Sequence, residues 1–336
     1  MNNYEKVCDV PVSSGGRSAV TSLDVEAPFS AAVSDFDASR RERRAGPIKK
    51  TIFKYLQPAI LLAILAFWSF APASVTGNPW VGSLAGTGIM AFIMALEWVN
   101  ERHAHWRLTV REFLEGAFYI VCNRYVFGAV SAVLLYDPLK AFVQGYGLTT
   151  SVATGLPLAV QVAMLIFMHE FVQYWFHRML HNHPALWEIH VPHHYITQMN
   201  TMNAAVGNWI EIMFLGVTLA IFFEMPRTAV LCAGNIGGAV AYFAHSNIRF
   251  DPPRWYSFFF TTIEHHSLHH SLEYDETRCN YANELILLDR VFGTFREGEA
   301  IHVGQDNQRR LSVWEQTIWP FLPLVAKLKA ALNRRR

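Results

Sequence analysis

The sequence has few charged residues and no paired cysteines, and both features exclude classes of protein. Charged residues make up 16% of the 336 residues, whereas a typical soluble domain has about 25%. The four cysteines lie far apart and form no C-x-x-C pattern, which argues against a disulfide framework and a thiolate zinc site. The formal net charge of +1 gives no support for nucleic-acid binding.

The N-terminal part of the sequence lacks the apolar core of a cleavable signal peptide. Residues 1–48 are instead rich in Ser, Ala, Asp and Arg, and this composition predicts a disordered basic arm. The arm has a basic run at 40–44 and is followed by an apolar segment. That order is typical of a cytoplasmic segment beside anionic lipid.

Apolar residues, by contrast, are abundant. They make up 52% of the chain, and the mean hydropathy is +0.16. Four apolar segments are close to the roughly 20 residues that cross a bilayer, and they lie at about 55–72, 80–99, 116–136 and 152–170. Arg124 lies within the third segment, which predicts either burial against neighbouring helices or a shallow position in the membrane.

The loops between these segments predict how the chain is oriented. Loop 100–115 carries three arginines, whereas loop 73–79 carries no cation and loop 137–151 carries one lysine. The positive-inside rule then places the N-terminus, and the chain after the fourth crossing, in the cytoplasm. Two shorter apolar stretches, 209–223 and 227–244, predict a hairpin that dips into the membrane. Two full crossings would leave the same topology.

These features together predict an all-α integral membrane protein with about four transmembrane helices, a re-entrant hairpin and a cytoplasmic helical cap. We divide it into the basic arm (1–48), a membrane domain (49–300) and a C-terminal segment (301–336). The C-terminal segment combines Trp, Leu and a basic tail, which predicts an interfacial helix or a helix packed on the core. Short hydrophilic ends and compact loops favour the bacterial inner membrane over the endoplasmic reticulum.

Three histidine clusters follow the fourth apolar segment. Imidazole is the commonest side-chain ligand for iron, zinc and copper, and histidines three or four residues apart share one face of a helix. Three such clusters aimed at one point could hold two metal ions. The clusters are His177 and His181; His190, His193 and His194; and His266, His269 and His270.

The local sequence also predicts how these clusters are presented. His177 and His181 continue the fourth apolar segment on one helix face. Pro192 favours a helix that starts near Val191, with His190 just before it. The third cluster contains no helix breaker and is expected to be helical. His245, at the end of the second hairpin arm, is a further candidate ligand.

Nine histidines exceed what one metal ion needs, so two ions with four or five ligands each are expected. Spacing alone does not select the metal. Six histidines are left outside this set. His169 is expected to support a ligand or to lie in the core, the role of His265 stays open, and surface or interface positions are expected for His103, His105, His183 and His302.

The clusters and their flanking residues resemble the fatty acid hydroxylase / sterol desaturase superfamily. The resemblance covers about residues 160–297. Three positions depart from the family pattern, because Glu170, Ala282 and Leu288 stand where Asp, Gly and Trp are usual, and none is a candidate ligand. The matching motifs are EFVQYWFHRMLH (170–181), LWEIHVPHH (186–194), HSN (245–247), HSLHHS (266–271), NY (280–281) and LDRVFGTF (288–295).

The resemblance implies an O2-dependent membrane oxygenase with two iron ions, which hydroxylates or desaturates a lipid. Asn280 and Asp289 would then have supporting or structural roles. The sequence lacks the His-Pro-Gly-Gly element of a fused haem domain, so an external electron donor is expected, either a ferredoxin or a b-type cytochrome with its reductase. The nine ligands would be His177, His181, His190, His193, His194, His245, His266, His269 and His270.

Several functions stay open at this point. A lipid hydroxylase could act on an acyl chain, a sterol, a polar-lipid headgroup or an alkyl ether, and a desaturase would use the same site. A zinc-dependent membrane hydrolase would need fewer histidines and a Glu base, and no H-E-x-x-H motif is present. A metal-binding or transport protein would place its ligands within the crossing helices rather than after them.

Overall fold

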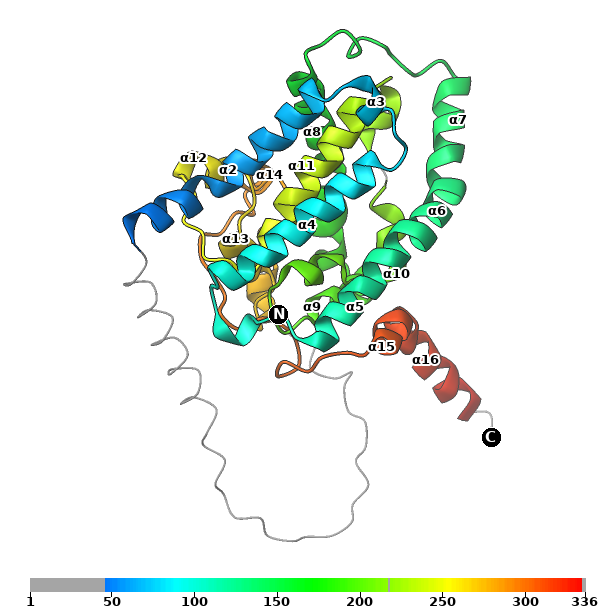
Figure 1. The fold of residues 1–336 in the computed structure, drawn as a ribbon. Helices are drawn as coiled ribbons and strands as arrows, with labels where there is room; N and C mark the ends of the chain where they lie inside the picture. Colours follow the sequence, from blue (N-terminus) through cyan, green and yellow to red (C-terminus); the bar gives the residue numbers. More distant parts are fainter. Residues whose placement is uncertain (1–45, 217, 334–336) are drawn as a thin grey trace.

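A computed structural model describes residues 46–216 and 218–333 of the chain, and all regular elements in this part are helices (Figure 1). The predicted basic arm (1–48) lies outside the described residues except for its last three positions. The first helix, α2, already begins at Pro47. The all-α fold class expected from the sequence is confirmed.

Four helices are long and apolar enough to cross a membrane. Each overlaps one of the four predicted segments, but only the third helix contains its segment in full, and the fourth helix starts later, at Leu158, and ends later, at Asn182. The third is a continuous helix, Val110–Gly145, in which α5 (Val110–Val121), α6 (Gly128–Ser131) and α7 (Asp137–Gly145) are joined by two short π-helical turns. The other three are α2 (Pro47–Phe70), α4 (Val81–Val99) and α8 (Leu158–Asn182), with the short α3 (Ala73–Thr76) between α2 and α4.

Arg124 in the third helix is not buried, contrary to one of the two expectations. Its side chain is exposed, and its guanidinium donates a hydrogen bond to Ser83 Oγ in α4. The contact with the neighbouring helix gives the cation a polar partner within an otherwise apolar segment.

Helix α11 (Arg227–His245) occupies the centre of the bundle and packs against α2, α4 and α8. Its sequence is rich in Gly and Ala, and small residues let neighbouring helices approach closely. Asn235 fastens two of these neighbours, because its Oδ1 accepts from Trp68 Nε1 at 3.0 Å and its Nδ2 donates to the Gly82 carbonyl at 3.2 Å. Satisfied polar contacts of this kind hold α2 and α4 in register with α11.

The predicted hairpin is formed by α10 (Trp209–Phe214), a 3-10 turn at Leu219–Phe222, and α11. Its bend reaches the loops that join the crossing helices at the end opposite the histidines. Phe223 pairs with Thr150 in the α7–α8 loop, and Arg227 donates to the Asn78 carbonyl at 2.9 Å. The hairpin therefore extends along the full depth of the bundle rather than part of it.

The other end of the bundle carries the short helices that complete the fold. Hydrogen bonds from Lys49 Nζ to the Val99 carbonyl (2.9 Å) and from Arg102 N to the Asn247 carbonyl (3.1 Å) bring together the ends of α2, α4 and α11 here. The start of α2 and the histidine clusters thus lie at the same end. The short helices are α9 (Pro184–His194), α12 (Arg254–Phe259), α13 (Ile263–His269) and α14 (Leu287–Phe292).

Helix α9 corrects the expectation that Pro192 starts a helix. The helix begins instead at Pro184 and runs through Pro192 to His194. Pro192 removes one hydrogen bond, but it sits in the last turn, where few further turns remain to be disrupted. His190 is consequently inside the helix rather than ahead of it.

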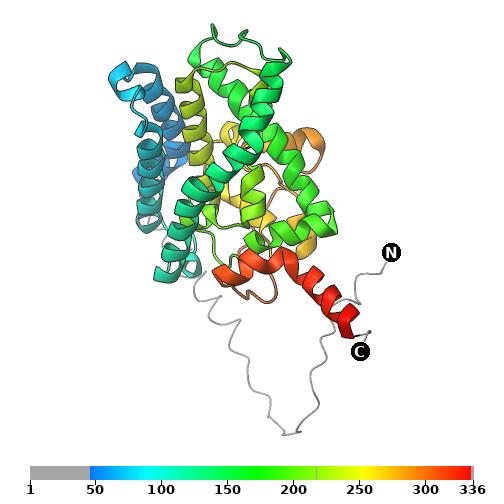
Figure 2. The same ribbon diagram turned by 90° about the vertical axis from the view of Figure 1, so that its right-hand side faces the viewer.

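The C-terminal segment forms α15 (Val313–Ile318) and α16 (Leu322–Asn333), which lie at the end opposite the α7–α8 loop (Figure 2). The packed form is found for α15, and the interfacial form stays a prediction for α16. Helix α15 packs on the body through Gln316, which is buried and donates to Glu115 Oε1 at 2.7 Å. Helix α16 instead exposes Leu324 and Leu328, as an interfacial helix would.

Candidate metal centre

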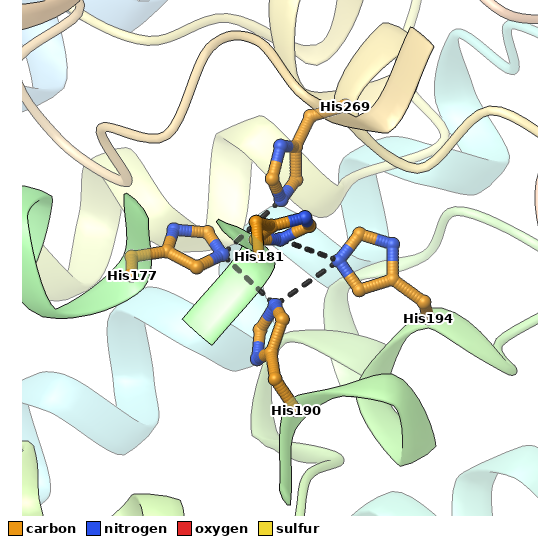
Figure 3. Close-up of side chains that lie close together, drawn as sticks. All are labelled: His177, His181, His190, His194 and His269. Atoms are coloured by element: carbon orange, nitrogen blue, oxygen red, sulfur yellow. Dashed lines mark hydrogen bonds between the residues drawn. The ribbon is translucent and has the colours of Figure 1, made fainter. Parts of the chain in front are cut away.

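All nine candidate histidines converge, and they form two groups. Within each group the ligand nitrogens all lie within 4.8 Å of one another. The five-histidine group, whose rings point toward a common centre in Figure 3, consists of His177, His181, His190, His194 and His269. The four-histidine group consists of His193, His245, His266 and His270.

The helices explain this division. Neighbouring helical residues point about 100° apart, so adjacent histidines face different directions. His193 joins the four-histidine group, whereas His194 joins the five-histidine group. His269 and His270, at the end of α13, are divided in the same way. Each H-x-x-H-H motif therefore serves both groups.

Within each group it is the Nε2 atoms that face one another. In the five-histidine group, His177 Nε2 is 2.9 Å from His190 Nε2 and 3.2 Å from His269 Nε2. In the four-histidine group, His266 Nε2 is 3.0 Å from His245 Nε2 and 3.2 Å from His270 Nε2. Two nitrogens bound to one ion by bonds of about 2.1 Å would lie about 3.0–3.4 Å apart. The observed spacings of 2.9–3.2 Å lie in the lower part of that range or just below it.

The outer nitrogens fix which ring atom carries the proton. A carbonyl oxygen can only accept, so an Nδ1 atom bonded to one must carry hydrogen, and its Nε2 then presents a lone pair. Four Nδ1 atoms donate to carbonyls: His177 to Tyr281 (2.6 Å), His269 to Cys279 (2.7 Å), His193 to Val206 (2.6 Å) and His245 to Ala241 (2.9 Å).

The pair His177 and His269 tests whether a metal ion fits. Both Nδ1 atoms are donors, so the two Nε2 atoms, 3.2 Å apart, face each other with lone pairs and no proton between them. That arrangement is repulsive unless a cation lies between the nitrogens. The donor set is entirely imidazole nitrogen, which suits iron, zinc and copper. A metal ion therefore fits the five-histidine group.

Burial keeps the imidazoles neutral, as metal ligands must be. It lowers the pKa of His190 to about 3 and the pKa of His193 to about 4. For the remaining ligands on the short helices, burial comes first and the neighbouring imidazoles second. These causes lower the pKa well below its ordinary value for His194, His266, His269 and His270.

The loop that supplies two of the carbonyls is itself held by the residues of the distal motif. Asp289 accepts from the backbone N–H groups of Tyr281 and Ala282, at 2.8 Å each. Asn280, whose φ of 51° lies in the left-handed region, donates from Nδ2 to the His265 and Arg296 carbonyls at 3.0 Å each. Asn280 and Asp289 thus position the loop whose carbonyls orient His177 and His269.

Two carboxylates of the site were not found by sequence reasoning. Glu211 Oε2 lies 2.9 Å from His190 Nδ1. Glu97 Oε1 accepts from the backbone N–H groups of Asn247 (3.0 Å) and Thr201 (2.7 Å), and so fixes the chain just after His245. Both glutamates interrupt apolar stretches, and an ionisable residue in such a stretch is the signal that could have found them.

The other six histidines belong to neither group. His169 lines a cavity beside the groups. His265 Nδ1 is 3.3 Å from Thr262 Oγ1, and its ring packs on Phe295. His103 Nε2 lies 2.9 Å from Glu299 Oε1. The remaining three are partly or fully exposed at the surface: His105, His183 and His302.

Comparison with known proteins gives this site a family. Residues 162–294, which contain both histidine groups, match the family model described as fatty acid hydroxylase. This segment matches that family, and the curated relatives that resemble it are lipid hydroxylases and monooxygenases. The four apolar helices and this similarity support a multi-pass membrane protein with a histidine cluster able to hold metal.

Three curated relatives from this superfamily are similar over part of their length. An ornithine lipid hydroxylase of Rhizobium tropici is 29% identical over 41% of this chain and 43% of its own. An alkylglycerol monooxygenase of Xenopus tropicalis is 29% identical over 38% and 28%, and a fatty acid hydroxylase of a Lecanicillium species is 28% identical over 48% and 48%. The similarity therefore spans less than half of each relative. No solved structure matches the chain.

Proposed function

We propose that this chain is an O2-dependent di-iron oxygenase that hydroxylates a membrane lipid. The observation that carries the proposal is the convergence of nine buried or half-buried histidines into two adjacent groups, inside the segment that matches the fatty acid hydroxylase family. The named relatives, which are lipid hydroxylases and monooxygenases, support an oxidoreductase.

Each group would hold one iron ion, the five-histidine group through Nε2 of His177, His181, His190, His194 and His269, and the four-histidine group through Nε2 of His193, His245, His266 and His270. When bound, the two ions would supply the reduction of O2 by two external electrons. The reaction then balances as a C–H bond, O2, two electrons and two protons giving an alcohol and water.

The protein's own residues would orient the ligands and admit the substrate. Hydrogen bonds to the outer nitrogens fix the rings, and such partners raise ligand basicity. A cavity of about 210 Å³ reaches both groups, since its lining includes His177 and His190 from one and His193 and His245 from the other. A lipid chain in this cavity would have its C–H bonds beside both ions while the surrounding helices exclude water.

Orientation and partners are part of the proposal. We place the N-terminus, the histidine groups and the cap in the cytoplasm, where a ferredoxin or a b-type cytochrome with its reductase could deliver electrons. The arginines of loop 100–115 and the shared location of the α2 start and the histidines support this orientation. We keep the bacterial inner membrane as the favoured location and 49–300 as the membrane domain.

A comparative lipid profile by mass spectrometry tests the proposal. Cells that express the full chain would be compared with cells that express the His193→Ala variant. A new lipid heavier by one oxygen is expected only with the unchanged chain. A lipid lighter by two hydrogens would identify a desaturase with the same site. An unchanged profile, together with purified protein that contains no iron, would contradict the proposal.

A further inference from the structure

Two internal cavities meet at a pair of polar side chains midway along the bundle. The larger, about 640 Å³, extends from Lys140 and Glu224 at the far end to His169 and Glu284. The smaller, about 210 Å³, extends from His169 and Glu284 to the histidine groups. These two residues are the only ones that line both cavities in the part of the chain that the structure describes.

Neither side chain has a hydrogen-bond partner among the described residues, and both side chains are half-buried where they line the cavities. The backbone N–H of Glu284 donates to Glu170 Oε1 at 3.0 Å, but its carboxyl oxygens are left for the cavity. Polar groups that line a cavity in this way are available to bond to a molecule that occupies it.

Helix α11 is shaped to admit this carboxyl group. A Cβ atom at Gly237 would lie 2.6 Å from Glu284 Oε2, which is far inside van der Waals contact. Only glycine at 237 leaves room for the carboxyl group where it is. At the next residue, Gly238, an added Cβ would make only an ordinary contact of 3.8 Å with Tyr242.

Burial, and then the neighbouring Glu170, raise the pKa of Glu284 well above its ordinary value. The raised pKa favours the protonated carboxyl group, which can donate one hydrogen bond and accept others. With the His169 imidazole beside it, the junction offers both a donor and an acceptor. These groups suit a neutral polar partner.

We propose that Glu284 and His169 bind an amide or hydroxyl group of the lipid substrate and thereby determine which carbon reaches the histidine groups. The inference rests on the proposed function. His169 precedes His177 by eight residues of α8, which is about 12 Å along the helix axis. A lipid held at the junction would present carbons about that far from its polar group to the metal centre.

Binding can be tested separately from oxygenation. The full chain would be placed in phosphatidylcholine nanodiscs, and retention of hexadecanol, hexadecanamide and hexadecane would be compared by mass spectrometry of the purified discs. We expect retention of the alcohol and the amide above the alkane. Glu284→Leu and Gly237→Ala should each lower it by about tenfold, the equivalent of one hydrogen bond, whereas Glu284→Gln should change it little and Gly238→Ala not at all.

The outcomes separate this inference from the proposed function. Equal retention of hexadecane, or unchanged retention in Glu284→Leu, would overturn the junction as a binding site even if the chain is an oxygenase. Preferred retention of hexadecylamine, which is a cation at neutral pH, would contradict the inference that the polar partner is uncharged. If the lipid profile shows no oxygenation but retention follows the variants as expected, only the proposed chemistry fails. Iron content and thermal unfolding of each variant confirm that it has folded.

Discussion

The two histidine groups differ in how their outer nitrogens are held. In the five-histidine group, two rings donate to the loop at 279–281 and His190 pairs with the Glu211 carboxylate. In the four-histidine group, His193 donates to a backbone carbonyl and His245 to the preceding turn of its own helix. Only the five-histidine group is therefore held by the loop at 279–281 and by a carboxyl side chain.

This difference suggests that the two histidine groups differ in how tightly they hold a metal ion and in how accessible that ion is. A carboxylate that orients a ligand also increases its basicity, and loss of such a partner typically lowers metal affinity by about 10–100-fold. The five-histidine group should therefore retain its ion more tightly. The four-histidine group offers fewer ligands and leaves more coordination positions open, so we infer that it is the more accessible to O2 and substrate.

Removing one ligand from either group should have the largest effect. His269→Ala and His266→Ala should each abolish oxygenated lipid, because the proposed reaction needs both ions. The purified His269→Ala protein should lose the ion of the five-histidine group, and His266→Ala that of the other. Iron analysis and product mass spectrometry measure both results, with His302→Ala as the matched control on an exposed histidine. Full activity in either ligand variant would remove the di-iron assignment.

Loosening the loop at 279–281 should lower metal affinity more in the five-histidine group than in the four-histidine group. Asp289→Asn replaces the acceptor of one backbone N–H by a donor, so the Tyr281 and Cys279 carbonyls should lose their position. We expect iron affinity to fall by about 10–100-fold at the five-histidine group only. Iron retention during titration with a chelator would show one weakened ion and one unchanged ion. Asp275→Asn, an exposed substitution, is the control, and equal weakening of both ions would show that the groups are not independent.

Removing the carboxyl group beside His190 should have a smaller effect in the same direction. Glu211→Gln keeps a polar side chain of the same length but replaces the carboxyl group beside His190 Nδ1 by an amide, which is a weaker hydrogen-bond acceptor. The ion of the five-histidine group should be released about tenfold more easily, which the same chelator titration measures. If Glu211→Gln retains iron as well as the exposed variant Glu273→Gln does, the carboxylate plays no part in retention.

Glu299 gives a contrast, because it stabilises the segment around Arg102 and His103 without contacting either histidine group. Burial raises its pKa, but hydrogen bonds from Arg102 and His103 outweigh this and lower the pKa of Glu299 to about 2. Its contribution is present above the unfolded value near 4.5 and is lost as the pH falls toward 2. Glu299→Gln should thus lower the free energy of unfolding by about 1–3 kcal/mol at pH 7 and by less at pH 4.

Thermal unfolding at the two pH values would measure this loss, and iron retention at pH 7 should stay unchanged. A variant that is destabilised but keeps both ions would show that the effects of Asp289 and Glu211 are specific to metal binding. A loss of unfolding free energy that does not depend on pH would mean that the Glu299 charge does not stabilise the segment around Arg102 and His103.

The sequence was sufficient for the parts of the molecule that depend on local spacing. The four crossing segments follow from length and hydropathy, and the ligand pair His177 and His181 follows from one helical turn. The division of His193 and His194 between two groups was not predicted, since Pro192 suggested a helix start that the fold does not use.

The hydrogen bonds that orient the ligand rings could not be predicted from local spacing, for a different reason. His177 is oriented by a carbonyl 104 residues away and His269 by one 10 residues away on a separate loop. Such partners depend on how the elements pack, and a carbonyl carries no side-chain signal. Asp289 was recognised as a family position, but its role required the positions of Tyr281 and Ala282.

The distribution of ligands along the chain has a consequence for biosynthesis. The first three crossing helices are complete before any of the nine histidines has been synthesised, and neither group is complete until residues 269 and 270 have emerged. The loop that orients two rings depends on Asp289, which follows later still. Insertion of the first three crossing helices must therefore proceed without a bound metal, and a metal ion can be captured by complete ligand sets only after residue 270 has been synthesised.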